Sequence, residues 1–264
     1  MQKLNIFLLG GTRDSINIIK YLKENFNTYI LTTTTTEYGS SLAIEAGSDD
    51  TIAKPLPKKD ILEILEKSNF DLIIDATHPF ASHITGTAIE CSKIMKIPYI
   101  RFERPISDDG SINHDKLHKV NSFVDAGKLI SKNFNQFNVL HLAGTNTIED
   151  VVKSVPKENF YARILKIDIS IKKCEDLEIP KENISFMNGV SSAEENIELI
   201  KKTNAKVVIS KESGKTGGLP EKIEACKKLN VDFILITRPV VSTLNENDIV
   251  RSLEELNNKL RTYF

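Results

Sequence analysis

Three polar residues able to do chemistry stand together in the segment DLIIDATHPFA, residues 71–81: Asp75, Thr77 and His78. A histidine can exchange protons near neutral pH, because the ordinary pKa of its imidazole lies there. His78 therefore qualifies as a proton donor or as a hydrogen-bonding partner of a ligand, and a capping or core imidazole is the structural alternative. His83 follows five residues later, which is not the helical spacing of a zinc pair.

The residues around this group predict a buried strand that leads into a helix. Leu72, Ile73 and Ile74 form a continuous apolar run, which is typical of a parallel strand covered on both faces. Pro79 has its φ set for a first helical turn. Apolar residues then recur at spacings of three and four: Phe80, Ala81, Ile84, Ala88, Cys91 and Met95. The polar group thus lies where a strand ends and a helix begins, the edge at which open parallel sheets bind ligands.

The chain begins with a similar pattern, KLNIFLLGGTRDS, which predicts a strand over residues 4–9, a turn and a helix. Gly10 and Gly11 would let a phosphate approach the backbone, and the helix N-terminus after Thr12 and Arg13 favours negative charge. The third glycine of G-x-G-x-x-G is missing. Nucleotide binding and a glycine needed only for turn geometry therefore both fit this segment.

A second strand, residues 28–33, ends in the run TTTTT before Glu37. An acidic residue at this point of a dinucleotide site would bind the ribose hydroxyls and repel a 2′-phosphate. Here the strand end offers hydroxyls, Thr33 among them, and Arg13 lies nearby in the pattern, which favours NADP over NAD. A threonine-rich strand selected for β-propensity is the alternative.

The order of the remaining elements predicts an α/β fold of two Rossmann-like lobes, with parallel sheets facing each other across a cleft. The first half continues with a strand at 51–53, a helix at 58–67 and the strand PYIRF. The polar segment ISDDGSINHDKLH then crosses to the second half, where Gly144 takes the place of Gly10 and Gly11. The predicted second half has strands at 161–165, 184–187, KVVIS and DFILITRP, and helices at 193–202 and from Pro220. The predicted domains are a cofactor-binding lobe at 1–112, an α/β lobe at 113–240 and a C-terminal helix at 241–264 that packs on either lobe.

Composition excludes several classes of protein. Of 264 residues, 40% are hydrophobic and 27% charged, which is typical of a globular protein. No apolar run is long enough for a membrane span and no signal peptide is evident, so we expect a cytoplasmic protein. The 35 basic and 36 acidic residues give no overall field for nucleic acid. Three isolated cysteines fit reduced thiols. His114 and His118 are four residues apart and could bind a metal only if helical, so no metal site is predicted.

Cationic residues at predicted strand ends suit an anionic ligand. Guanidinium groups bind carboxylates and phosphates through forked hydrogen bonds, and four arginines qualify: Arg101, Arg104, Arg163 and Arg238.

The loop KESGKTGG is not a P-loop, because Ile209 stands where the first glycine is required. It would instead direct Lys211, Ser213 and backbone amides toward a ligand, and a glycine-rich surface loop is the alternative. The chain also lacks the Tyr-x-x-x-Lys pair of short-chain dehydrogenases and the G-x-S-x-G of hydrolases.

The segments LLGGTRDS, DATHPFAS, IPYIRFERP, SKESGKTGGLPEKIEA and ILITRP resemble, in this order, the precorrin-6A reductase family of corrin (vitamin B12) biosynthesis. The likeness covers nearly the whole chain, and DATHPFA followed by IPYIRFERP is its most specific part. It implies an enzyme that transfers a hydride from NADPH or NADH to one double bond of precorrin-6A, or of its cobalt form, giving precorrin-6B. The chain departs from the family at Thr87, in the segment AGTNT and at Lys215.

The resemblance also implies roles for individual residues. The cofactor would be held by Gly10, Gly11, Thr12 and Arg13 at its phosphates, with Thr33, Thr77 and Ser213 as further contacts. His78 and Lys211 are the candidate proton donors, beside water. The four arginines would bind the carboxylates of a tetrapyrrole, the expected small-molecule partner, and the chain would be a monomer or a homodimer. Two alternatives stay open: another two-lobed nucleotide-dependent enzyme, such as a glycosyltransferase, and a non-catalytic tetrapyrrole-binding protein.

Overall fold

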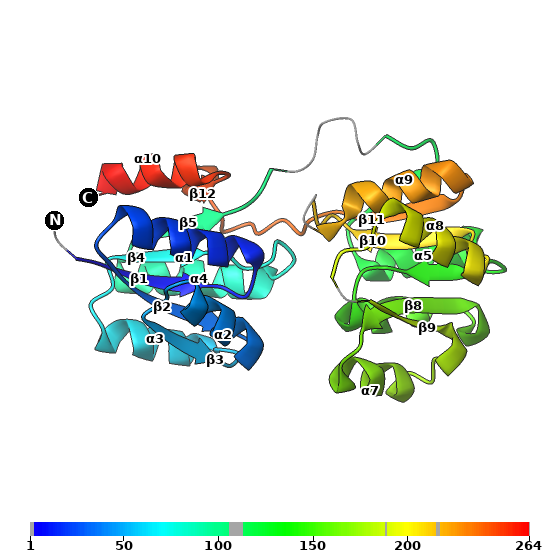
Figure 1. The fold of residues 1–264 in the computed structure, drawn as a ribbon, viewed down its shortest axis with the longest axis horizontal. Helices are drawn as coiled ribbons and strands as arrows, with labels where there is room; N and C mark the ends of the chain where they lie inside the picture. Colours follow the sequence, from blue (N-terminus) through cyan, green and yellow to red (C-terminus); the bar gives the residue numbers. More distant parts are fainter. Residues whose placement is uncertain (1–2, 106–112, 188, 215–216, 264) are drawn as a thin grey trace. The chain divides into compact units, whose positions relative to one another are not determined.

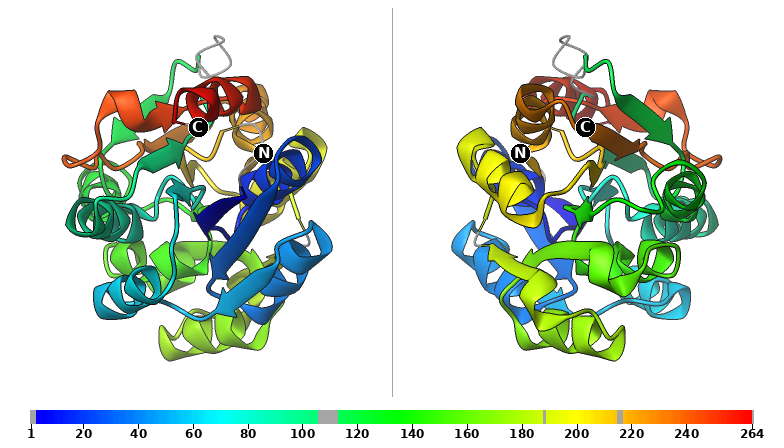
Figure 2. Two further views of the ribbon diagram at one scale, coloured as in Figure 1. Left: turned by 90° about the vertical axis from the view of Figure 1, so that its left-hand side faces the viewer. Right: turned by 90° about the vertical axis from the view of Figure 1, so that its right-hand side faces the viewer.

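The computed structural model describes residues 3–105, 113–187, 189–214 and 217–263, and it forms two compact units. The first unit comprises Met1–Arg104 and Val240–Phe264, and the second comprises Pro105–Pro239. Each unit is built on one six-stranded sheet in which every pairing is parallel, with helices on both faces (Figure 1 and Figure 2). The predicted α/β architecture of two Rossmann-like units is confirmed. The predicted domain boundary at residue 112 lies outside the described residues.

The first sheet has the strand order β12-β5-β4-β1-β2-β3. Its strands are β1 (Leu4–Leu9), β2 (Thr28–Thr34), β3 (Asp50–Ala53), β4 (Leu72–Asp75), β5 (Tyr99–Phe102) and β12 (Ile249–Val250). Its helices are α1 (Arg13–Asn25), α2 (Glu37–Glu45), α3 (Lys58–Lys67), α4 (Ser82–Met95) and α10 (Leu253–Tyr263). The chain reverses its winding direction between β1 and β4, which makes the gap between these neighbours the topological switch point.

Apolar side chains alternate across the first sheet. Ile6 and Leu8 of β1 belong to a buried cluster with α1 and α10 on one face. Phe7 and Leu9 belong to a second cluster with α3 and α4 on the other face. This two-sided burial explains the continuous apolar run of the central strands.

The predicted start of α4 is wrong. The helix begins at Ser82 and not at Pro79, and Ala81 precedes it with φ −88° and ψ 45°. Residues 78–81 form a separate turn, closed by a hydrogen bond from Ala81 N to His78 O at 2.8 Å. The His78 ring also accepts a hydrogen bond from Phe80 N at 3.2 Å, so a local side-chain contact competes with the first helical turn.

The second sheet has the order β6-β11-β10-β7-β8-β9, which reproduces the topology of the first. Its strands are β6 (Leu117–Val120), β7 (Val139–His141), β8 (Phe160–Leu165), β9 (Ile184–Met187), β10 (Val207–Lys211) and β11 (Asp232–Ile236). Its helices are α5 (Phe123–Asn133), α6 (Glu149–Val152), α7 (Asp168–Asp176), α8 (Ala193–Thr203) and α9 (Leu219–Leu229), with the 3₁₀ turns η1 (Thr145–Thr147), η2 (Lys157–Asn159) and η3 (Lys181–Asn183). The turn η5 (Glu246–Asp248) precedes β12 in the first unit. Gly144 after β7 has φ +88°, close to the +87° of Gly11 after β1.

The edge strands β6 and β12 do not pair with the strand that precedes them in the sequence. β6 follows β5 in sequence but pairs with β11, and β12 follows β11 but pairs with β5. Neither strand was predicted, because β6 lies in a polar segment and β12 has two residues. The hypothesis of a helical histidine pair is wrong: His118 lies in β6 and its Nε2 contacts Asp232 Oδ1 at 2.7 Å.

Within the described ranges, no group of three or more His, Cys, Asp or Glu side chains could hold a metal ion. None of the helices there combines the length and apolarity that crossing a bilayer requires.

His141 of β7 is an ionisable group fully enclosed by the core of the second unit. Its ring lies between Phe123 and Phe160, at centroid distances of 6.0 and 5.8 Å. Burial, and then the charge of Lys211, lower its pKa from 6.5 to about 3. The buried imidazole is therefore neutral in the folded protein at neutral pH.

We predict that His141 makes the fold sensitive to acid. Because the unfolded chain binds this proton near pH 6.5 and the folded chain only near pH 3, stability falls as the pH drops through that window, by at most about 1.4 kcal/mol per pH unit from this group. His141→Gln should flatten the dependence, measured by denaturant unfolding between these pH values. Parallel curves for variant and wild type would contradict the prediction.

Candidate functional site

Two glycines form the turn after β1, and each is required for a different reason. A Cβ on Gly10 would lie 2.9 Å from Thr32 Cγ2 and 3.2 Å from Ser15 Oγ, so the backbone packs too closely for a side chain. Gly11 has φ +87°, in the region that favours glycine, and nothing lies within 4 Å of the position its Cβ would take. The turn therefore presents bare, accessible backbone at the start of α1.

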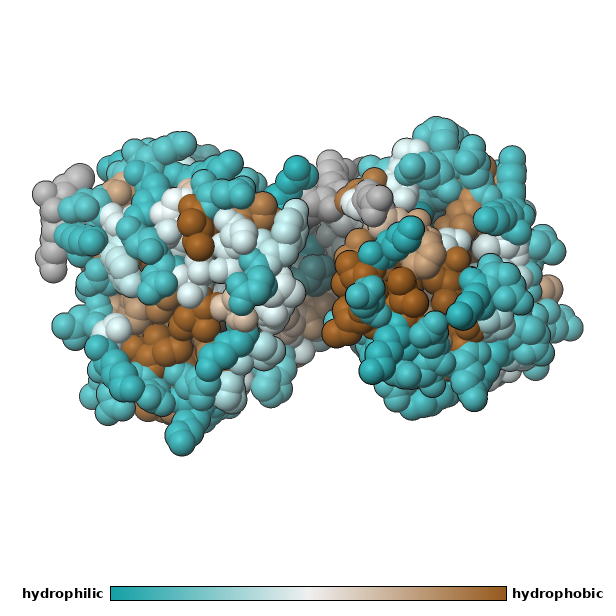
Figure 3. Space-filling model, turned by 60° about the horizontal axis from the view of Figure 1, so that its bottom comes forward, coloured by the Kyte–Doolittle hydropathy of each residue, from teal (hydrophilic) through white to brown (hydrophobic). Residues whose placement is uncertain are grey.

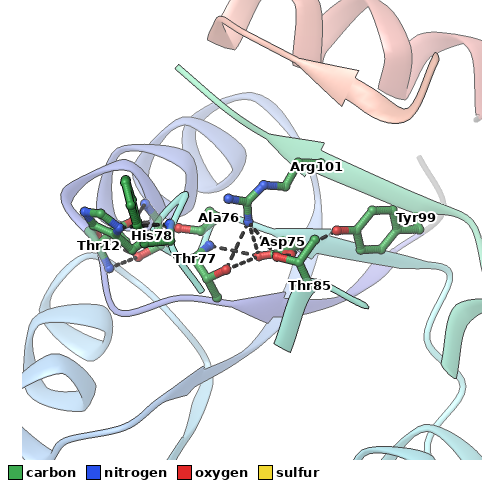
Figure 4. Close-up of polar contacts among 10 residues, drawn as sticks. Thr12, Asp75, Ala76, Thr77, His78, Thr85, Tyr99 and Arg101 are labelled. Atoms are coloured by element: carbon green, nitrogen blue, oxygen red, sulfur yellow. Dashed lines mark hydrogen bonds and ion pairs between the residues drawn. The ribbon is translucent and has the colours of Figure 1, made fainter. Parts of the chain in front are cut away.

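Thr12 joins this turn to the DATHPFA segment. Its Oγ1 accepts a hydrogen bond from Ser15 N at 3.1 Å, and Ser15 Oγ accepts one from Thr12 N at 3.2 Å, which forms a capping box. The Thr12 hydroxyl donates its proton to Ala76 O at 2.7 Å (Figure 4). The hydroxyl proton of Thr12 is therefore used in a hydrogen bond within the protein. The Thr12 side chain thus positions the two loops of the site relative to each other.

Asp75 organises the loop at the end of β4. It is fully buried, and its Oδ1 accepts hydrogen bonds from Arg101 Nη1 at 2.7 Å, Thr77 Oγ1 at 2.6 Å and Thr77 N at 2.9 Å (Figure 4). Its Oδ2 accepts from Thr85 Oγ1 at 2.7 Å and Tyr99 OH at 2.9 Å. This Asp75 network joins β4, β5, α4 and the loop, and it gives both oxygens of the buried carboxylate hydrogen-bond donors.

Tyr99 serves the network as a neutral donor. Burial, and then the charge of Asp75, raise the pKa of its phenol well above the ordinary value. The hydroxyl therefore keeps its proton and directs it at the carboxylate.

His78 lies half-buried in the turn that follows Thr77. Its Nδ1 accepts the hydrogen bond from Phe80 N, and its ring contacts the Phe80 ring at a centroid distance of 5.8 Å. A neutral imidazole that accepts at Nδ1 carries its proton on Nε2. The turn thus fixes both the position and the tautomer of His78.

The remaining predicted cofactor residues of the first unit lie on the same edge of the sheet. Arg13 is exposed at the first position of α1, and Thr33 is buried with its carbonyl accepting from Gly10 N at 2.8 Å. Gly10, Gly11, Thr12, Arg13, Thr33, Thr77 and His78 are therefore brought together around the switch point.

The four predicted arginines differ in their surroundings. Arg101 is 2% exposed and holds Asp75, so its burial favours an internal role over the predicted contact with substrate carboxylates. Arg163 of β8 is 5% exposed and donates from Nη1 to Asn196 Oδ1 at 2.8 Å. The other two are half-buried at strand ends: the Nε atoms of Arg104 and Arg238 donate to Asp14 Oδ2 at 2.5 Å and to Glu212 O at 3.4 Å.

In the second unit, Lys211 ends β10 and Ser213 follows in the loop. Burial lowers the pKa of Lys211, and Ser213 is 8% exposed. Lys215 and Thr216 of this loop lie outside the described residues. Sequence reasoning missed three polar residues that the structure places at the two sites: Thr85, Tyr99 and, in α9, the buried Lys222.

Two doubly wound sheets with a glycine turn at the switch point define a Rossmann-like α/β protein. The chain belongs to the precorrin-6x reductase CbiJ/CobK family, which it matches over residues 5–261. Membership of this reductase family implies a reduced nicotinamide cofactor, and the predicted family is confirmed.

Individual relatives agree with this assignment. The chain is 38% identical over 247 residues to the cobalt-precorrin-6A reductase of Methanothermobacter thermautotrophicus, covering 93% of this chain and 80% of that one. It is also 38% identical over 239 residues to the cobalt-precorrin-6A reductase of Methanocaldococcus jannaschii, covering 90% and 92%. The solved structure of a CobK precorrin-6A reductase shares the fold, with a TM-score of 0.73 at 19% identity over 98% of this chain and 97% of that one.

We predict that the Asp75–Arg101 pair is critical for stability. Arg101→Ala would leave a fully buried carboxylate without its counter-ion, which costs about 3 to 5 kcal/mol. Arg251→Ala is the matched control, because Arg251 pairs with Glu246 on the surface and its loss should cost less than about 1 kcal/mol. Urea unfolding of both variants measures the difference, and equal losses would contradict the prediction.

Proposed function

We propose that this protein reduces cobalt-precorrin-6A to cobalt-precorrin-6B in cobalamin biosynthesis, with a hydride taken from NADPH. Family membership and the two archaeal relatives named cobalt-precorrin-6A reductases support the reaction. The observation that carries it is the junction of the glycine turn and the DATHPFA segment through Thr12 and Ala76, at the switch point where Rossmann-like sheets bind nucleotides.

The glycine turn fits the pyrophosphate of a dinucleotide. Gly11 leaves open space where any other residue would place a Cβ, and the 13-residue helix α1 begins directly after it. The amino end of a helix attracts negative charge through its dipole and its free N–H groups. Arg13 adds an exposed cation at the same point.

The end of β2 favours NADPH over NADH. Thr34 and Thr36 use their hydroxyls within the loop, where Thr34 Oγ1 donates to Thr36 O at 2.9 Å and Thr36 caps α2. Thr35 is exposed between them, and the first acidic residue after the strand is Glu37. A 2′-phosphate would meet hydroxyls there instead of the carboxylate that repels it in NAD-specific sites.

The reaction adds one hydride and one proton across a carbon–carbon double bond of the macrocycle, and NADPH becomes NADP⁺. The reduced nicotinamide supplies the hydride. His78 is the proposed proton donor, because an imidazole takes up and releases a proton near neutral pH and the turn holds its ring in position. The Asp75 network holds the turn in place, which keeps the donor oriented. Lys211 is the second candidate, since its lowered pKa makes it a better acid near neutrality.

The second unit offers an apolar surface at the carboxyl ends of β8 and β9. Five large apolar side chains are exposed there: Leu165, Ile167, Ile169, Phe186 and Val190. Figure 3 shows apolar residues gathered on the surface of this unit. Lys166 Nζ lies 5.8 Å from the centre of the Phe186 ring. An apolar surface bordered by cations is complementary to a macrocycle with a carboxylate rim, which supports a role in substrate binding.

We predict that Gly11→Asp abolishes most cofactor binding. The change places a negative charge at the amino end of α1, and it should raise the NADPH Kd at least about tenfold, or about 1.4 kcal/mol. Gly189→Asp is a matched control, because Gly189 has φ +86° and equally open space. Fluorescence titration with NADPH measures both, and loss of binding only in the Gly11 variant is expected. Unchanged NADPH binding in that variant would place the cofactor away from this turn and contradict the prediction.

We predict that His78→Gln slows the reaction without weakening cofactor binding. Removing a proton donor lowers kcat by about 100-fold or more. His83→Gln is the control, since His83 is exposed on α4. Steady-state oxidation of NADPH with cobalt-precorrin-6A gives kcat, and an unchanged kcat would assign proton donation to Lys211 or water.

A further inference from the structure

The second unit buries two cations that form no ion pair within the described ranges. Arg163 and Lys222 are 5% and 8% exposed, and within the described ranges neither forms an ion pair. Arg163 donates from Nη1 to Asn196, but its Nε is buried without a hydrogen-bond partner. Buried charges in proteins are normally paired, because leaving water costs several kcal/mol per ion. Glu195 acts electrostatically on Arg163 and Glu221 on Lys222, but neither forms an ion pair with its cation in those ranges, so the two charges are only partly balanced.

The two cations are close enough to affect each other. Burial, and then the charges of Arg163 and Lys211, lower the pKa of Lys222 to about 7, while Glu221 acts in the opposite direction. Burial also lowers the pKa of Arg163. An anion placed between them would reverse this mutual repulsion.

A third unsatisfied donor lies in the loop above these cations. Ser213 is 8% exposed and its Oγ is buried without a partner. Gly217 packs against it, since a Cβ on Gly217 would lie 2.1 Å from Ser213 Oγ. Lys222 holds this loop, because its Nζ donates to Gly217 O at 2.9 Å and to Ser210 Oγ at 3.3 Å.

The site therefore combines buried donors from three elements. Arg163 comes from β8, Ser213 from the loop after β10, and Lys222 from the first turns of α9. The amino end of α9 adds the positive end of a helix dipole to the same region. A neutral donor at position 222 would suffice to hold the Gly217 carbonyl, so loop support alone does not explain a buried charge there.

We propose that Arg163, Ser213 and Lys222 form an oxyanion subsite beside the amino end of α9. Resting on the proposed function, its ligand is either a peripheral carboxylate of the macrocycle or a phosphate of the cofactor. Both are planar or tetrahedral oxyanions that these donors recognise through charge-assisted hydrogen bonds.

The test uses Lys222→Met, which keeps the volume and removes the charge. The apo variant loses a buried charge and also the hydrogen bonds from Lys222 Nζ to Gly217 O and Ser210 Oγ, so the phosphate response and not the apo stability is the readout. Inorganic phosphate should raise the unfolding temperature of wild type but not of the variant. Lys228→Met is the control, since Lys228 lies exposed on the same helix, paired with Glu224. Ser213→Ala should also weaken the phosphate effect.

Enzyme kinetics then identify the source of the oxyanion. A KM for cobalt-precorrin-6A raised about tenfold or more, with kcat nearly unchanged, assigns the subsite to a substrate carboxylate. A raised Kd for NADPH with an unchanged macrocycle KM assigns it to a cofactor phosphate. If Lys222→Met destabilises the protein and leaves the phosphate response and both affinities unchanged, Lys222 only supports the loop and the proposal is overturned. The phosphate response needs no turnover, so it stands even if the proposed reaction fails.

Discussion

The ion pair between Asp75 and Arg101 is the interaction on which the first unit's site depends. Its desolvation offsets much of the Coulomb attraction, so its main effect is geometric. One carboxylate at the end of β4 accepts hydrogen bonds from the neighbouring strand β5, one helix and the loop backbone, so none of these can shift without leaving a donor or the charge unsatisfied. Through Thr77 it fixes the start of the turn that carries His78, and through Ala76 this segment meets the capped glycine turn.

The two units share one topology but place opposite charges at the same point. β4 and β10 occupy equivalent positions in their sheets; β4 ends in the acid Asp75 and β10 in the base Lys211. In the first unit the charges balance internally, which makes a rigid support. In the second unit Arg163 and Lys222 are buried and form no ion pair within the described residues, which suits the proposed binding of an anion from outside. The same scaffold thus provides a fixed framework in one half and unsatisfied donors in the other.

Short stretches of sequence were sufficient to predict the features that depend only on residues close together in the chain. Continuous apolar runs predicted the buried strands, and the glycines after β1 predicted a turn with bare backbone. The contacts between residues on neighbouring strands could not be predicted from short stretches of sequence in this way. Asp75 and Arg101 are register partners on β4 and β5, so the arginine's burial depends on a strand alignment that no single segment encodes. The alternation of β5 was the available signal, since it places Tyr99 and Arg101 on the same face. The two-residue β12 and the polar β6 are strands only because a neighbouring strand accepts them.

The exchange of β6 and β12 has a consequence for biosynthesis. A ribosome delivers β1 to β5 long before Ile249 and Val250 emerge, so β5 stays uncovered on its outer side until β12 has been made. Until then, β5 presents open backbone groups to any extended segment nearby. The nascent chain therefore completes its second sheet before its first.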